Sequence, residues 1–282
     1  MTSKKIIFLL LLPLLVIFFT VSSCKTISIK NYSINAPLEK DSIIKIVLIS
    51  DLHSTIFGKN QGRLIEKVRK QNPDLIILSG DILDDEVPHH GTELLLSGIK
   101  DLAPVYYVTG NHEYWSYDMP GIRELLKSYN VIILSDNYVT VNINNNDIIL
   151  AGIEDPEKKR YETPDYNQNA SMENAFRELD DIKLFKILIA HRPENIENYK
   201  KFSFNLILSG HTHGGQIRMP PFLNGLYAPN QGFFPKYAGG LYRHEKSAHI
   251  ISRGLSVNPK LHRIFNPPEL VIIVLKPEGL NQ

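Results

Sequence analysis

The sequence lacks several features that would place a protein in a class at once. It has one cysteine, so no disulfide framework can hold the fold together. It has 31 basic and 30 acidic residues, and without a basic excess or a long run of one charge nothing favours nucleic acid as a partner. It contains no internal repeat and no low-complexity segment. What remains is a chain of 282 residues, 43% of them hydrophobic, which is long enough for one globular domain with a sizeable core.

Residues 1–24 have the character of an export signal. Lys4 and Lys5 are followed by an uncharged apolar run at residues 6–21, which is shorter than the roughly 20 residues of a membrane-spanning helix. The run ends in VSSC, which resembles a bacterial lipobox whose cysteine, here Cys24, is lipidated and becomes the first residue of the mature chain. The alternative is an uncleaved signal anchor. Both interpretations predict a protein held at a bacterial cell membrane, on its extracytoplasmic face.

The rest of the chain predicts one α/β domain. Residues 25–42 are polar and predict a tether, and residues 43–277 alternate between apolar runs and helical patterns. Strands are expected at residues 43–50, 74–80, 105–110, 131–135, 185–191, 204–208, 248–254 and 269–276. Helices are expected at residues 60–70, 93–102, 122–128, 172–179 and 194–201, with a hairpin turning at residues 144–146. Strand–helix alternation followed by strand pairs indicates an α/β sandwich with two mixed sheets and helices outside.

Five of the expected strands end in side chains that can bind a metal ion. In chain order these are Asp51 and His53, Asp81 and Asp84, Asn111 and His112, His191, and His211 and His213. Singly, each has an ordinary explanation, such as a helix cap for an aspartate or a turn for an asparagine. Open α/β sheets bind their ligands at the carboxyl ends of the strands, so five such ends together predict one shared site.

The donor atoms indicate the kind of metal. They fall into two sets that Asp81 can bridge: Asp51, His53 and His213, and Asn111, His191 and His211. Oxygen and nitrogen donors without sulfur suit manganese, iron or zinc. Seven donors exceed the three that a mononuclear zinc hydrolase needs. We therefore expect two divalent metal ions, which at about 3.5–4 Å apart can clamp phosphate oxygens and activate water.

The five motifs DLH, GDILD, GNHE, the lone His191 and GHTHGGQ resemble, in order and spacing, those of calcineurin-like metallophosphoesterases. The segments GHTHGGQIRMP and FNPPEL are similar to the membrane-associated YaeI/YkuE-type subgroup. That subgroup includes phosphodiesterases and a UDP-diacylglucosamine pyrophosphatase of lipid A synthesis. The resemblance covers roughly residues 44–275 and implies a four-layer α/β-β/α sandwich. We expect manganese in the two metal sites, with iron or zinc as the alternatives.

The resemblance also implies a role for each residue. One metal ion would be held by Asp51, His53, Asp81 and His213, and the other by Asp81, Asn111, His191 and His211. His112 would stabilise or protonate the leaving oxygen without binding metal, and Asp84 would orient His112. Glu113 stands where many members have aspartate, which is tolerable because that residue is not expected to be a ligand.

The expected activity is hydrolysis of a phosphodiester or pyrophosphate bond in a lipid or cell-envelope molecule. The alternatives are a broad-specificity phosphomonoesterase and a metal-binding envelope protein of little catalytic power. Residues 219–242, rich in proline, glycine and aromatics, form either a flap packed on its own core or an apolar rim for an amphiphilic substrate. Arg192, Arg218 and Arg243 are candidate phosphate contacts. The remaining histidines, expected at the surface or in packing, are His89, His90, His244, His249 and His262. The oligomeric state stays open.

Overall fold

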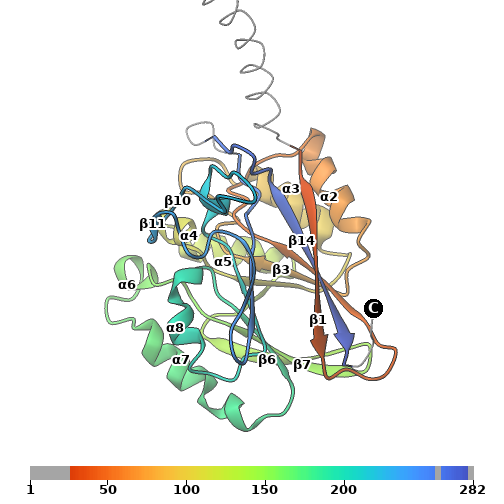
Figure 1. Cartoon of the computed structure of the whole chain (residues 1–282). Helices are drawn as coiled ribbons and strands as arrows, with labels where there is room; N and C mark the ends of the chain where they lie inside the picture. Colours follow the sequence, from red (N-terminus) through yellow and green to blue (C-terminus); the bar gives the residue numbers. More distant parts are fainter. Residues whose placement is uncertain (1–25, 258–261, 279–282) are drawn as a thin grey trace, which may run out of the picture.

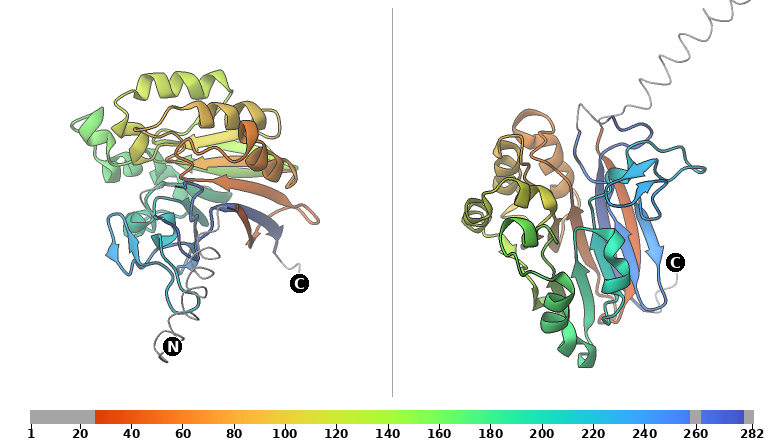
Figure 2. Two further views of the ribbon diagram at one scale, coloured as in Figure 1. Left: turned by 90° about the horizontal axis from the view of Figure 1, so that it is seen from above. Right: turned by 90° about the vertical axis from the view of Figure 1, so that its left-hand side faces the viewer.

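Two six-stranded sheets pack face to face, with helices on their outer faces (Figures 1 and 2). The computed structural model describes residues 26–257 and 262–278. The first sheet has the strand order β1-β14-β2-β3-β4-β5, and the second has the order β12-β13-β9-β8-β7-β6. The expected α/β sandwich with two mixed sheets is confirmed.

Each sheet is mixed because its parallel strands are flanked by an antiparallel pairing. In the first sheet β14 runs antiparallel to β2 and parallel to β1, and the other neighbours are parallel. Its strands are β1 (Ser28–Ala36), β2 (Ile44–Ile49), β3 (Leu75–Ser79), β4 (Val105–Val108), β5 (Ile132–Ile133) and β14 (Glu269–Pro277). The second sheet has antiparallel pairs at both edges. Its strands are β6 (Asn137–Ile143), β7 (Asn146–Gly152), β8 (Phe185–Ile189), β9 (Leu206–Ser209), β12 (Gly240–Arg243) and β13 (Ala248–Ile251).

The helices cover the outer faces and leave the space between the sheets to apolar side chains. The α-helices are α2 (Gly62–Arg69), α3 (His90–Ile99), α4 (Asn111–Trp115), α5 (Met119–Ser128), α6 (Lys158–Tyr161), α7 (Gln168–Phe176) and α8 (Ile196–Tyr199). In β2, Ile46 and Leu48 face the second sheet, whereas Val47 and Ile49 pack in the cluster under α2, α3 and α5. A third cluster joins the second sheet to α7 and α8. Strands buried on both faces explain the nearly continuous apolar runs of the sequence.

The expected tether at residues 25–42 is wrong for half of its length. Residues 28–36 form β1, which pairs with β14 from Ser28↔Glu269 to Ala36↔Pro277. Sequence inspection missed β1 because it is an edge strand whose outward side chains are exposed, so its sequence, SIKNYSINA, is mostly polar. Main-chain hydrogen bonds to β14 do not require apolar side chains. The domain therefore begins well before residue 43.

The other expected strands and helices are present, with ends that differ by several residues. The hairpin is confirmed, since β6 and β7 pair up to Ile143↔Asn146. Helix α4, directly after β4, was not expected, and it places Asn111 and His112 in its first turn. Within the described ranges, no helix is long and apolar enough to cross a membrane. The export signal expected at residues 1–24, including Cys24, lies outside those ranges.

Candidate metal centre

The sheets end at one edge in sharp loops that carry the candidate ligands. Five of these residues adopt left-handed backbone angles, with φ of 48° at Asp51, 48° at His53, 52° at Asp81, 70° at His211 and 49° at His213. Such angles are uncommon outside glycine, cost roughly 1–3 kcal/mol each and cluster at functional sites. This conformation turns the chain sharply after each strand, so that the polar side chains of the loops lie at the same edge of the sheets.

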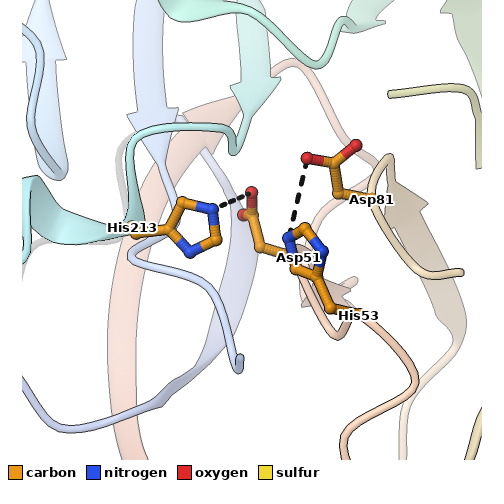
Figure 3. Close-up of side chains that lie close together, drawn as sticks. All are labelled: Asp51, His53, Asp81 and His213. Atoms are coloured by element: carbon orange, nitrogen blue, oxygen red, sulfur yellow. Dashed lines mark ion pairs between the residues drawn. The ribbon is translucent and has the colours of Figure 1, made fainter. Parts of the chain in front are cut away.

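Four of the expected ligands form a first group. Asp51, His53, Asp81 and His213 each offer a donor atom, and these atoms all lie within 4.8 Å of one another. Figure 3 shows the four side chains converging from the loops after β2, β3 and β9. His53 Nε2 lies 3.7 Å from Asp81 Oδ2, and His213 Nε2 lies 3.8 Å from Asp51 Oδ1. These gaps are too long for hydrogen bonds and leave the donors aimed at a common point.

A second group shares Asp81 with the first. Asp81, His191 and His211 also offer donors within 4.8 Å of one another, and His191 Nε2 lies 3.1 Å from Asp81 Oδ2. Asn111 is also buried. The residue after it, His112, donates its main-chain N–H to Asp81 Oδ1 at 2.9 Å, so the chain at Asn111 lies close to this group. The structure therefore brings six of the expected ligands into two groups that share Asp81, and Asn111 is the chain neighbour of a residue that contacts Asp81.

The histidines of both groups are held through the ring nitrogen that faces away from the centre. The partner atoms are Asp84 Oδ2 for His53 Nδ1 (2.8 Å), Ser79 O for His191 Nδ1 (2.8 Å), Asn230 Oδ1 for His211 Nε2 (2.7 Å) and Ser256 Oγ for His213 Nδ1 (2.9 Å). A carboxylate, a carbonyl and an amide oxygen can only accept, so in three of the rings the outer nitrogen carries the proton. The inner nitrogen is then free to bind a metal ion.

Two buried atoms without partners also fit a metal centre. Within the described part of the chain, His53 Nε2 and Asn111 Oδ1 have no hydrogen-bond partner although both are buried, and an unsatisfied buried polar atom is costly. Burial, with the charges of His191 and Arg192, lowers the pKa of His211 to about 3, which keeps this ring neutral as a ligand must be. Burial also lowers the pKa of His191, but Asp81 and Asp51 outweigh it and raise that pKa to about 10. A cation would therefore displace a proton from His191.

Glu113 holds the loop that carries Asp81. Its carboxylate accepts hydrogen bonds from the main-chain N–H groups of Asp81 (3.0 Å), Ile82 (2.7 Å), Leu83 (3.1 Å) and Gly110 (2.8 Å). The side chain is fully buried and belongs to neither ligand group. The expectation that Glu113 is not a ligand agrees with this position. Its hydrogen bonds instead hold the turn after β3 at the edge of the sheets that carries the candidate ligands, which we call the metal edge.

The expectation that Asp84 orients His112 is wrong in part. Asp84 Oδ2 lies 2.8 Å from His53 Nδ1 but 3.7 Å from His112 Nδ1. His112 Nδ1 instead lies 2.5 Å from Asp85 Oδ1. The sequence offers two consecutive aspartates, and only the backbone of this loop decides which of them faces which imidazole. Asp85 therefore holds His112, and Asp84 mainly holds His53.

The single tryptophan of the chain lies against His112. The rings of His112 and Trp115 are 4.6 Å apart between centroids, one turn apart in α4. His112 also contacts the ring of His53 edge-on at 4.2 Å. Sequence inspection gave no role to Trp115, because nothing in the sequence shows which helical face it occupies. Its indole is a natural fluorescent reporter beside the candidate centre.

The segment at residues 219–242, which we call the aromatic flap, is joined to the centre. Its strands β10 (Tyr227–Ala228) and β11 (Gly232–Phe233) pair antiparallel. At the turn between them, Asn230 Oδ1 accepts hydrogen bonds from His211 Nε2 and from Arg192 Nη1, the latter at 3.1 Å. Arg192 also donates to both carboxylate oxygens of Asp155. Arg192, which was expected to contact phosphate, is therefore already paired with protein side chains. Asn230 positions His211, and sequence inspection missed this residue.

A different arginine has free donors near the centre. Arg263 is buried and donates from Nε to the carbonyl of Ser256, whose hydroxyl contacts His213. Both of its terminal nitrogens are buried and have no hydrogen-bond partner among the residues that the structure describes. Burial lowers the pKa of Arg263 to about 10, and Asp51 opposes that shift. A buried guanidinium with unpaired donors calls for an anion.

The other arginine candidates and the spare histidines lie apart from the ligands. Arg218 donates to the carbonyl and side chain of Asn224 within the flap. Arg243 lines a cavity of about 680 Å³ with Ile43 and Phe185, which lie where β2 and β8 begin, whereas the candidate ligands follow the ends of their strands. Five histidines belong to none of the metal-competent groups found among the described residues: His89, His90, His244, His249 and His262.

Comparison with known proteins shows the family to which the chain belongs. Residues 44–215 match the model of the calcineurin-like phosphoesterase family. The chain is 33% identical to an uncharacterised metallophosphoesterase of Campylobacter jejuni, over 95% of this chain and 68% of that protein. It is 29% identical to the metallophosphoesterase YkuE of Bacillus subtilis, over 82% of this chain and 79% of that protein.

Among solved structures, the NAD nucleotidase of Haemophilus influenzae shares the fold. The TM-score is 0.51 at 17% identity, over 77% of this chain and 46% of that one. An identity this low shows the fold alone. The family match and the relatives carry the assignment: the chain belongs to the calcineurin-like phosphoesterases, a family of metal-dependent phosphoester hydrolases.

Proposed function

We propose that the chain is a binuclear enzyme that hydrolyses a phosphodiester or pyrophosphate bond in a lipid or cell-envelope molecule, with manganese as the metal. The observation that carries the proposal is the position of Asp81, whose carboxylate belongs to both ligand groups. Burial opposes ionisation of Asp81, but His191 and His112 hold its pKa well below the usual range. An ionised carboxylate between two groups of donors is suited to bridge two cations.

The surrounding side chains suit a phosphoester. Two divalent cations, when bound, would neutralise phosphate oxygens and assist attack by water. His112 lies beside both groups without being needed in either, and a histidine held by Asp85 can donate a proton to a leaving oxygen. Arg263 offers unpaired donors to the anionic part of a substrate. These residues would bind, orient and protonate the substrate.

The test is hydrolysis by the purified full chain loaded with manganese. The substrates are bis-(p-nitrophenyl) phosphate, p-nitrophenyl phosphate and UDP-diacylglucosamine, with Asp81→Asn as the inactive control and Asp101→Asn as the matched control at an exposed site. We expect the diester or the pyrophosphate to be cleaved faster than the monoester. Faster cleavage of the monoester would instead indicate a broad phosphomonoesterase. No hydrolysis by a metal-loaded chain would leave only a metal-binding protein.

We also propose that residues 1–24 attach the enzyme to the extracytoplasmic face of a bacterial membrane, through a lipid on Cys24 or as an uncleaved anchor. The support is the sequence pattern of a basic start, an apolar run and VSSC. Cys24→Ser should abolish both incorporation of labelled lipid and removal of the signal. If native protein begins at Met1 and carries no lipid, the anchor interpretation holds.

A further inference from the structure

The aromatic flap exposes apolar side chains that the fold does not use. Phe222 is 84% exposed, and Phe233 and Phe234 are each 70% exposed. Met219 and Tyr227 are also exposed, so the aromatic flap contains five exposed large apolar side chains. Soluble domains seldom gather large apolar side chains at one exposed place, and such patches mark binding surfaces.

The stretch of sequence that carries these side chains has charges of one sign. No aspartate or glutamate occurs between Glu197 and Glu245, whereas Lys236 lies within the flap and Arg218 and Arg243 directly flank it. An apolar segment that carries and adjoins cations and contains no acidic residue of its own fits an interface with anionic lipid, where aromatic side chains enter the headgroup region and cations meet the surface charge. A protein partner would not require this absence of acidic residues.

The flap lies at the end of the domain where the chain enters it. Ser28 begins β1 beside Glu269, the first residue of β14, and Val271 pairs with Leu48 near the end of β2. The start of β1 and the metal edge therefore share one end of the first sheet. In Figure 1, β10 and β11 also lie at the end from which β1 starts.

The same end is tied to the flap by hydrogen bonds. Ser28 donates its main-chain N–H to the carbonyl of Pro268, and Arg218, the residue directly before the flap, donates its main-chain N–H to the carbonyl of Ile264. The flap in turn contacts the loop after β9, residues 210–216, which carries His211 and His213 and which we call the metal loop. Leu226 donates its main-chain N–H to the carbonyl of Gly215 in this loop. The entry of the chain, the flap and the metal loop thus form one continuous region.

Because residues 28–36 form β1, few residues connect the domain to residues 1–24. A tether at residues 25–42 would reach roughly 60 Å at about 3.3 Å per residue. Ile27, however, is buried in the core, and only three residue steps separate it from Cys24, a reach of roughly 10 Å. Even from residue 21 the reach is about 20 Å. A domain attached so closely must turn this end toward the bilayer.

We infer that the aromatic flap is a membrane-docking surface that inserts Phe222, Phe233 and Phe234 into the interface of an anionic lipid bilayer. The inference rests on the proposed attachment through residues 1–24. Docking holds the metal loop against the bilayer, because Asn230 links the flap to His211. A substrate would then be taken from the membrane surface, with its phosphate at the metal edge and its apolar part toward the lipid.

The depth of single labels in the membrane tests this inference. The full chain with Cys24→Ser, which removes the only native thiol, receives Phe233→Cys or Phe222→Cys and a polarity-sensitive fluorophore. Asn145→Cys, exposed at the hairpin beside Ile43, reports the opposite end of the domain. The chains are reconstituted in vesicles of phosphatidylglycerol and phosphatidylethanolamine containing a nitroxide-labelled lipid. Metal content, measured on each labelled chain, shows that it remains folded.

We expect the labels at positions 222 and 233 to be quenched by the nitroxide lipid and the label at position 145 to stay unquenched. Lys236→Glu should reduce the quenching at position 233, whereas Lys183→Glu, exposed at the start of β8, should not. A chain that floats with vesicles while its flap labels remain as unquenched as the hairpin label would overturn the docking surface. Equal quenching in phosphatidylcholine vesicles would overturn the assignment to anionic lipid. Neither readout depends on hydrolysis, so failure of the enzymatic proposal is seen separately.

Discussion

Nδ1 of His211 lies 3.2 Å from Nε2 of His191, with both rings buried. The opposite nitrogen of each ring donates to an oxygen, Ser79 O for His191 and Asn230 Oδ1 for His211. Two facing nitrogens without protons would repel each other, so something positive has to lie near both. In the absence of metal, a proton on His191 supplies this positive charge, as the raised pKa of His191 indicates. A divalent cation that also meets Asp81 satisfies the same requirement with more ligands.

The two ligand groups predict two metal equivalents per chain. Asp81→Asn should lose both, or nearly so, because one carboxylate serves both groups. Elemental analysis after manganese loading and a titration followed by Trp115 fluorescence measure this, with Asp101→Asn as the control. One equivalent at saturation in the native chain would contradict the binuclear centre, and two tightly held metals in Asp81→Asn would contradict the bridge.

Substitutions of the consecutive residues Asp84 and Asp85 should have different effects on metal affinity and turnover. Asp84→Asn weakens the hold on His53 and should lower metal affinity, whereas Asp85→Asn should keep the metal and slow turnover, because Asp85 contacts His112. Metal content and kcat, measured on both variants, show the difference. If Asp84→Asn kept full metal affinity and copied the kinetic loss of a His112 variant, the contacts of this loop would have been misassigned.

His112→Ala should leave metal content near normal and slow turnover by about 10²–10⁴-fold on an ester with a poor leaving group. Nitrophenolate departs readily as an anion, so the loss on a nitrophenyl ester should be smaller. The measurement is kcat on an alkyl or nucleotide diester and on the nitrophenyl diester. Equal losses on both would remove His112 from the leaving-group role, and loss of metal would make it a ligand.

Asn230→Ala tests the link between the flap and the centre. It removes the acceptor of His211 Nε2 and one partner of Arg192. Loss of a residue that orients a ligand costs about 10–100-fold in metal affinity, so manganese affinity should fall in that range. Asn145→Ala, at an exposed turn, is the control. Unchanged affinity would show that His211 needs no help from the flap.

Glu113→Gln should destabilise the fold. The amide leaves one oxygen for four main-chain donors and turns an N–H₂ group toward the rest. Each buried donor without an acceptor costs roughly 1–3 kcal/mol, so the free energy of unfolding should fall by about 2 kcal/mol or more. Denaturant unfolding of Glu113→Gln and of the exposed control Glu124→Gln measures the difference. Equal stability of the two variants would contradict the role given to Glu113.

Most of both sheets, and the strand ends that carry the seven candidate ligands, could be predicted from the sequence. Buried strands such as β2 and β3 carry nearly continuous apolar runs, and each ligand follows such a run directly. The edge strand β1 could not be predicted in this way, because its partner β14 is more than two hundred residues away and supplies main-chain hydrogen bonds rather than an apolar pattern.

The sequence by itself determined the kind of donor and the strand ends that carry each one, since these follow from local order along the chain. Only the tertiary structure decided the contacts around them: Asp85 rather than Asp84 on His112, Asn230 on His211, and Arg263 with unpaired donors near Asp51. Asp84 and Asp85 are adjacent and chemically identical, and Asn230 and Arg263 come from segments distant in sequence. The direction in which a loop turns depends on what it packs against, and no local pattern encodes that.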